Sequence, residues 1–95
     1  MTIQSYRDQR LQAVLEGRKL PKGVPADLAG VLRRKLVMLD AATALDDLRM
    51  PPANHLEALK NDRKGQHSIR VNDQFRLCFR WTDDGPADVE FVDYH

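Results

Sequence analysis

A single cysteine, Cys78, is present among the 95 residues, so no disulfide can form within the chain. A lone cysteine inside an alternating strand pattern is typical of a small packed side chain in a reducing cytosol. No apolar run is long enough to cross a bilayer, and the charged start MTIQSYRDQR lacks the apolar centre of a secretory signal. These absences predict a cytoplasmic protein.

Motifs for several common classes of enzyme are also missing. The sequence contains no glycine-rich phosphate loop, no zinc-ligand spacing and no nucleophile elbow. The three histidines, at positions 55, 67 and 95, are scattered and are not accompanied by paired cysteines. We therefore expect neither a metal nor another cofactor.

Charge is distributed unevenly, although the net charge is only +1. Residues 1–24 and residues 55–81 each carry a net charge of +3, whereas the last fourteen residues hold five acids and no lysine or arginine. One surface patch can therefore attract phosphate while the whole molecule stays almost neutral. We expect weak non-specific binding to nucleic acid, so that chemistry on RNA would need another component to hold the substrate.

The length allows one small domain, residues 1–95, with a modest core. Apolar spacing of three and four residues predicts helices over residues 7–16, ended by Gly17, and from residue 25 or 26 to 42. Arg33, Arg34 and Lys35 are interpreted as solubility charges on the second helix. A short helical turn is expected at 44–48, and further strands at 3–6, at 54–59 with Leu56 and Ala58 inward, and at 88–94. This order predicts an α+β fold, with two N-terminal helices packed on a mainly antiparallel sheet of four to five strands.

Residues 59–81 carry the strongest pattern. Apolar and polar residues alternate over 67–72 and again over 75–81, on either side of the polar turn 72–74. This pattern predicts a β-hairpin whose apolar face meets the core. The cations on the opposite face, and those in the loop before the hairpin, then lie close together: Arg70, Arg76 and Arg80, with Lys60, Arg63 and Lys64.

That cluster suggests an anion-binding surface. The alternative is an ordinary exposed face, on which Arg70 and Arg80 pair with acids of a neighbouring strand such as Glu90, and Arg63 and Lys64 belong to a solvated loop. Asp93, Tyr94 and His95 put a carboxylate, a phenol and an imidazole at the end of the last expected strand, which can neighbour the hairpin. Terminal residues are commonly frayed and inert, so their spacing alone decides nothing.

Three segments closely resemble the HigB-type toxins, also called plasmid maintenance killer proteins, of the RelE-like superfamily. They are PPANHLEALK at 51–60, DRKGQHSIRVNDQFRLCFRW at 62–81 and VDYH at 92–95. The first half is also similar, including RRKL at 33–36 and LDAA at 39–42. The resemblance therefore extends over nearly the whole chain.

The resemblance implies a RelE-like fold and a toxin of a type II toxin–antitoxin system, which inhibits translation and growth by cleaving messenger RNA on the 70S ribosome. It implies neutralisation by a HigA-type helix-turn-helix antitoxin, contact with operator DNA only through that antitoxin, and no membrane partner. The catalytic residues that it implies are Lys60, Arg76, Asp93, Tyr94 and His95. The remaining cations are then expected to bind RNA: Arg63, Lys64, Arg70 and Arg80. Two positions depart from the family: Asn61 replaces the usual glycine, and Glu57 replaces a histidine of some relatives and is not counted as catalytic.

These residue types suit RNA cleavage without a metal. The 2′-hydroxyl of RNA can attack the adjacent phosphorus, which leaves a 2′,3′-cyclic phosphate and a 5′-hydroxyl, if a base, an acid and positive charge are at hand. We expect Lys60 and Arg76 to stabilise the developing charge and Tyr94 to orient or stack the nucleotide. Asp93 and His95 would share the proton transfers, in an order that the sequence leaves open. A non-cleaving ribosome- or RNA-binding growth inhibitor, and a small binding module without toxicity, remain as alternatives.

Overall fold

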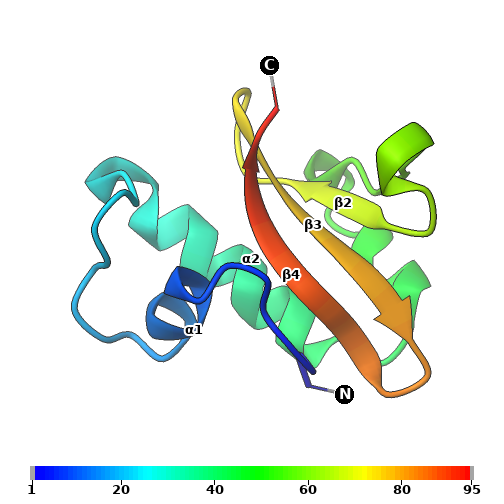
Figure 1. Cartoon of the computed structure of the whole chain (residues 1–95), viewed down its shortest axis with the longest axis horizontal. Coiled ribbons are helices and arrows are strands. Elements are labelled where there is room, and N and C mark those ends of the chain that lie inside the picture. The colour runs from blue at the N-terminus through cyan, green and yellow to red at the C-terminus, as the bar shows by residue number, and fades with distance from the viewer. Residues whose placement is uncertain (1, 95) are drawn as a thin grey trace.

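Residues 2–94 are described in the computed structural model, which places two α-helices beside a four-stranded antiparallel sheet (Figure 1). The predicted site residue His95 lies outside the described residues. The α-helices are α1 (Arg10–Leu15) and α2 (Ala29–Ala41), and the strands, in sheet order, are β1 (Glu57–Ala58), β2 (His67–Arg70), β3 (Phe75–Thr82) and β4 (Gly85–Asp93). Short 3₁₀ helices connect them: η1 (Ala26–Leu28), η2 (Leu45–Arg49), η3 (Pro52–Asn54) and η4 (Asn61–Arg63). The α+β prediction is confirmed.

The core lies between the α-helices and one face of the sheet. Helix α2 buries Leu32, Leu36 and Leu39 completely, and these residues recur at the spacing that brings side chains to one helix face. They join buried residues of α1 and of the strands: Leu11, Val14, Ile69, Leu77, Phe79 and Val89. The spacing of apolar residues in the sequence therefore predicted which face of α2 and which face of the β2–β3 hairpin are buried in the core.

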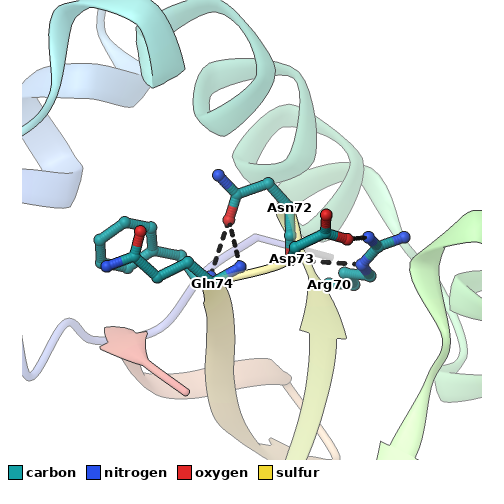
Figure 2. A network of polar contacts seen from close by, with 5 residues as sticks. Arg70, Asn72, Asp73 and Gln74 are labelled. Atoms are coloured by element: carbon teal, nitrogen blue, oxygen red, sulfur yellow. Dashed lines mark hydrogen bonds and ion pairs between the residues drawn. The ribbon is translucent and has the colours of Figure 1, made fainter. Parts of the chain in front are cut away.

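The predicted hairpin is confirmed as strands β2 and β3. Their antiparallel register pairs Ile69 with Leu77 on the core face and Arg70 with Arg76 on the other face. Figure 2 shows the connecting turn, where the side-chain oxygen of Asn72 accepts hydrogen bonds from the backbone N–H groups of Gln74, at 2.9 Å, and Phe75, at 2.7 Å. Asparagine favours turns because it can make such bonds to its own following backbone.

The predicted strand at residues 3–6 is wrong as a regular strand. This segment runs along the outer edge of β4 and forms one isolated parallel bridge, between Tyr6 and Val89. A bulge in β4 explains the difference: Asp88 has a positive φ of 53°, and its N–H bonds to the Ser5 hydroxyl, at 2.8 Å. Regular pairing is interrupted there because a bulge residue is displaced from the ladder.

The two predicted helices are confirmed with shifted starts. Helix α1 begins at Arg10 and not at residue 7, because the Asp8 carboxylate accepts bonds from both the backbone and the guanidinium of Arg10 and holds the preceding residues in a turn. These hydrogen bonds keep the pKa of Asp8 below its usual value. The helix ends before Gly17, whose φ of 72° is the left-handed conformation that glycine permits. The second helix begins with the 3₁₀ turn η1 and continues as α2.

The predicted strand at 54–59 is reduced to the two residues of β1. Asn54 belongs to η3 instead, and its fully buried side chain bonds to the Lys35 ammonium and the Leu48 carbonyl. Pairing of this segment with β2 starts only after Asn54, at Glu57. The expectation that Ala58 points inward is wrong, because Ala58 is exposed and Leu56 is half-buried.

Among residues 2–94, no helix has the length and apolar character needed to cross a membrane.

Candidate nucleic-acid interface

The end of β4 lies beside the β2–β3 turn, at the edge of the molecule where the chain finishes (Figure 1). The Tyr94 N–H donates to the Gln74 carbonyl at 2.6 Å, and the Gln74 side-chain amide donates to the Asp93 carboxylate at 3.1 Å. These bonds bring two predicted catalytic residues, Asp93 and Tyr94, to the tip of the hairpin. Tyr94 remains 43% exposed, which suits a residue that meets a ligand.

Arg76 of β3 lies beneath Tyr94, with its guanidinium carbon 5.7 Å from the tyrosine ring centroid. One terminal nitrogen, Nη1, donates to the Ser68 hydroxyl at 2.9 Å and to the His55 carbonyl at 3.2 Å. The other, Nη2, pairs with the Glu57 carboxylate at 3.2 Å. Only 14% of the Arg76 side chain is exposed, so its guanidinium is held in a defined orientation.

A cavity of about 250 Å³ opens beside Arg76. Its lining combines the hairpin tip with Glu57 and Tyr94: Glu57, Arg70, Asn72, Asp73, Gln74, Arg76 and Tyr94. Arg70 and Arg76 stand directly opposite each other across the strand pair, where like charges repel. Each is balanced by a carboxylate, because Arg70 forms an ion pair with Asp73, as Figure 2 shows, and Arg76 pairs with Glu57.

A second cavity, of about 260 Å³, contains the predicted catalytic lysine. It is lined by Glu57, Ala58, Leu59, Lys60, Asn61 and Tyr94. Glu57 and Tyr94 line both cavities and therefore form the boundary between them. The fold thus places Lys60 and Arg76 on the two sides of Tyr94.

The backbone after Lys60 turns sharply. Asn61 has a φ of 56°, in the left-handed region, which glycine adopts freely and which asparagine tolerates better than most residues. Arg63 then reaches across the sheet and donates to Glu90, at 3.0 Å, and to Gln66, at 3.2 Å. The hydrogen bond to Glu90 raises the pKa of Arg63. This pair fastens η4, and with it the segment that follows Lys60, to the sheet.

The other predicted RNA-binding cations are dispersed. Arg70 lines the first cavity, but within residues 2–94 neither cavity is lined by Arg63, Lys64 or Arg80. Lys64 and Arg80 are exposed, and the Arg80 guanidinium lies over Gly65. The suggested pairing of Glu90 with Arg70 or Arg80 is wrong, because Glu90 pairs with Arg63.

Several contacts at the site were missed from the sequence. Ser68 shares the strand face of Arg70 and Arg76, so its alternation could have indicated a contact. The backbone carbonyl of His55 gives no sequence signal, since it depends on a left-handed residue with a φ of 44°. Gln74 could be found only once the register of β4 was known.

The one cysteine of the chain is poorly suited to nucleophilic chemistry. Cys78 is fully buried, and that burial raises the pKa of its thiol, which disfavours the reactive thiolate. Over residues 2–94, three or more histidine, cysteine or acidic side chains do not gather in a way that could hold a metal ion.

Comparison with known proteins places these residues in context. A family model described as the RelE-like toxin of the type II toxin–antitoxin system HigB matches residues 4–95. Toxin HigB-1 of Vibrio cholerae is 43% identical over 90 residues, which cover 95% of this chain and 94% of that protein. Endoribonuclease HigB of Proteus vulgaris is 29% identical over 93 residues, covering 98% and 99% of the two chains. An uncharacterized protein of Haemophilus influenzae is 41% identical over 76 residues, or 80% of this chain and 75% of that protein.

Proposed function

Because the chain belongs to the HigB family of RelE-like toxins from type II toxin–antitoxin systems, we propose that it is an endoribonuclease that cleaves messenger RNA on the translating ribosome. Cleavage would inhibit translation and growth. The name of the Proteus vulgaris relative, Endoribonuclease HigB, supports the reaction. The observation that carries the proposal is the pair of adjoining cavities, which presents Lys60 and Arg76 on either side of the exposed Tyr94 ring.

The two cations would stabilise the negative charge that develops on the phosphate oxygens. Attack by the 2′-oxygen places extra negative charge on the phosphate oxygens, and fixed cations stabilise that charge most strongly when little water surrounds them. Arg76 is held by Ser68 and the His55 carbonyl before substrate arrives, so its guanidinium needs little reorganisation. Lys60 would act from the second cavity.

The last three residues of the chain would carry out the proton transfers and orient the nucleotide. Asp93 and His95 would take the proton from the 2′-hydroxyl and return one to the leaving 5′-oxygen, and each such transfer typically contributes ~10²–10⁴-fold. Tyr94 would stack on a base or orient the ribose beside its phosphate. Because Asp93 is bonded to Gln74, the carboxylate is positioned by the hairpin turn.

Three features of this site support dependence on the ribosome. The cavities are small, the molecule is nearly neutral, and Arg63 is occupied by Glu90. Alignment of the 2′-oxygen with the leaving oxygen can account for ~7–11 kcal/mol of a barrier. The ribosome would supply that alignment by presenting an extended stretch of messenger. RNA next to the cleaved bond would contact three further cations. They are the exposed Lys64 and Arg80, and Arg70 of the first cavity.

A toxin of a type II system has an antitoxin partner. We propose a HigA-type helix-turn-helix protein, through which alone the toxin would be carried to operator DNA. Action on ribosomes would place the toxin in the cytoplasm.

The test compares programmed ribosomes with naked messenger at equal RNA concentration, using primer extension to find new 5′ ends. We expect clear cleavage on ribosomes and negligible cleavage of naked RNA, since only the ribosome aligns the strand. Lys60→Ala and Arg76→Ala should each lower the cleavage rate at least about 100-fold, on the scale expected for removal of one charge-stabilising group. Lys22→Ala, which removes an exposed lysine outside both cavities, is the matched control and should cleave normally.

Two results would count against the proposal. Equal rates on ribosomes and on naked RNA would exclude ribosome dependence. Growth arrest without new 5′ ends would identify a non-cleaving inhibitor that binds the ribosome. Undiminished cleavage by His95→Gln would remove that residue from the mechanism and leave the rest intact.

A further inference from the structure

We propose that the Glu57 carboxylate occupies the position of a substrate phosphate in the free protein, and that RNA must displace it from Arg76 in order to bind. The inference rests on the proposed function and names a residue that controls access to the same site. It assigns to Glu57 an inhibitory contact, in place of a catalytic one.

The partners of Arg76 differ in how firmly they are held. Ser68 is fully buried, and the His55 contact comes from backbone, so both are fixed parts of the fold. Glu57 is different, because 53% of its side chain is exposed and it lies on the two-residue edge strand β1. Rotation of its side chain into solvent would leave Nη2 of Arg76 facing the first cavity while Nη1 stays anchored.

The position of Glu57 is the one that a bound phosphate requires. A phosphate that contacts both Lys60 and Arg76 has to lie at the boundary of the two cavities, and that boundary is formed by Glu57 and Tyr94. Carboxylate and phosphate oxygens are alternative acceptors for the same guanidinium donors. Two anions at one place repel each other, so the carboxylate and the phosphate exclude one another.

The second arginine of the first cavity provides an internal comparison. Asp73 pairs with Arg70 as Glu57 does with Arg76, but Asp73 is 96% exposed and only three residues away in sequence. Such a pair is strongly screened by water and contributes little. Loss of Asp73 should therefore affect anion binding far less than loss of Glu57, although both substitutions remove one negative charge from the same cavity.

The experiment measures the affinity of the full-length chain for a 2′-O-methyl RNA tetranucleotide, which cannot be cut because its 2′-oxygen is blocked. Glu57→Gln should lower Kd about fivefold, since the competing anion is gone while a side chain of similar shape remains. Asp73→Asn and the loop variant Asp62→Asn, which change the net charge equally, should each stay within about twofold of the parent chain.

A second measurement uses only the parent chain, so its result does not depend on whether a variant folds correctly. Titration of the parent chain with the same tetranucleotide should shift the carboxylate carbon resonance of Glu57 and the guanidinium resonances of Arg76 together, at the same ligand concentration. The Asp62 carboxylate resonance should stay in place.

Specific outcomes would overturn the inference. Equal tightening by all three variants would show a general effect of net charge, and unchanged or weaker binding by Glu57→Gln would show that the carboxylate does not compete with phosphate. A Glu57 resonance that stays in place at saturation would exclude displacement. These outcomes are separate from the proposed function, because cleavage on ribosomes by the parent chain is measured independently of tetranucleotide affinity.

Discussion

At the scale of single residues, Asn54 shows how one buried polar side chain determines the path of the backbone. It is fully buried, accepts a 2.6 Å hydrogen bond from the Lys35 ammonium and donates to the Leu48 carbonyl at 3.0 Å. Burial also lowers the pKa of Lys35, with a further contribution from Arg34. The interpretation of Lys35 as a solubility charge is therefore wrong. The Lys35–Asn54 contact joins α2 to the segment that leads into β1 and the site.

We predict that Asn54→Ala lowers the free energy of unfolding by about 2–3 kcal/mol, because the Lys35 ammonium and the Leu48 carbonyl would both lose a buried partner. Urea denaturation followed by circular dichroism measures the change. Asn54→Asp, which keeps an acceptor for Lys35 but removes the amide donor, separates the two contacts. Gln12→Ala, at an exposed position of α1, is the control. An Asn54→Ala variant as stable as this control would show that the buried contacts contribute nothing net.

At the scale of elements, the short helix η4 depends on an ion pair that crosses the sheet. Arg63 and Glu90 are 27 residues apart in sequence, and their side chains are only 28% and 26% exposed. Hydrogen bonds to half-buried partners are less screened than those at a fully exposed surface. The position of the Lys60 loop therefore depends on a residue of β4, which lies far along the chain.

We predict a coupling free energy of about 1 kcal/mol between Arg63 and Glu90, after allowance for their partial exposure to solvent. It is obtained from a double-mutant cycle with Arg63→Ala and Glu90→Gln, measured by urea denaturation. Amide hydrogen exchange at residues 61–63 should also accelerate in both single variants, because the loop loses its attachment.

The matched control is the ion pair between Asp46 and Arg49, whose side chains are 82% and 67% exposed. The same cycle there should detect no coupling, because water screens the pair. Coupling of equal size in the two cycles would contradict the view that attachment to the sheet distinguishes Arg63.

At the scale of the whole molecule, the fold depends on one layer of apolar side chains shared by α1, α2 and the sheet. The stripe on α2 was visible in the sequence, but its partners on the strands, such as Ile69 and Val89, lie 30 to 57 positions later. Helix α2 is amphipathic, and its stability comes mainly from the packing of its apolar face on the sheet. Adjacent residues of α2 should therefore differ sharply in their contribution to the free energy of unfolding.

We predict that Leu36→Ala lowers the free energy of unfolding by about 2–5 kcal/mol, the usual cost of emptying a buried leucine site. Leu36 is 0% exposed, whereas the adjacent Val37 is 42% exposed. Val37→Ala should change stability by no more than about 0.5 kcal/mol and serves as the control. Urea denaturation measures both. Similar losses in the two variants would mean that the packing of α2 on the sheet is not what stabilises the fold.

The sequence by itself determined the elements with clear periodicity. Alternation over residues 67–81 predicted β2, β3 and the turn between them, and spacing of three and four residues predicted the buried face of α2. Such patterns can be read locally because they depend on which side of an element meets water. The resemblance to HigB-type toxins added the family, which the comparisons confirm.

Only the tertiary structure decided which side chains meet. Arg76 contacts Glu57 and the His55 carbonyl, and Glu90 pairs with Arg63, in arrangements that no spacing indicated. The bulge at Asp88 and the left-handed residues His55 and Asn61 also escaped prediction. The physical reason is that ion pairs and strained backbone depend on the closure of loops between distant elements, whereas periodicity depends on near neighbours and solvent.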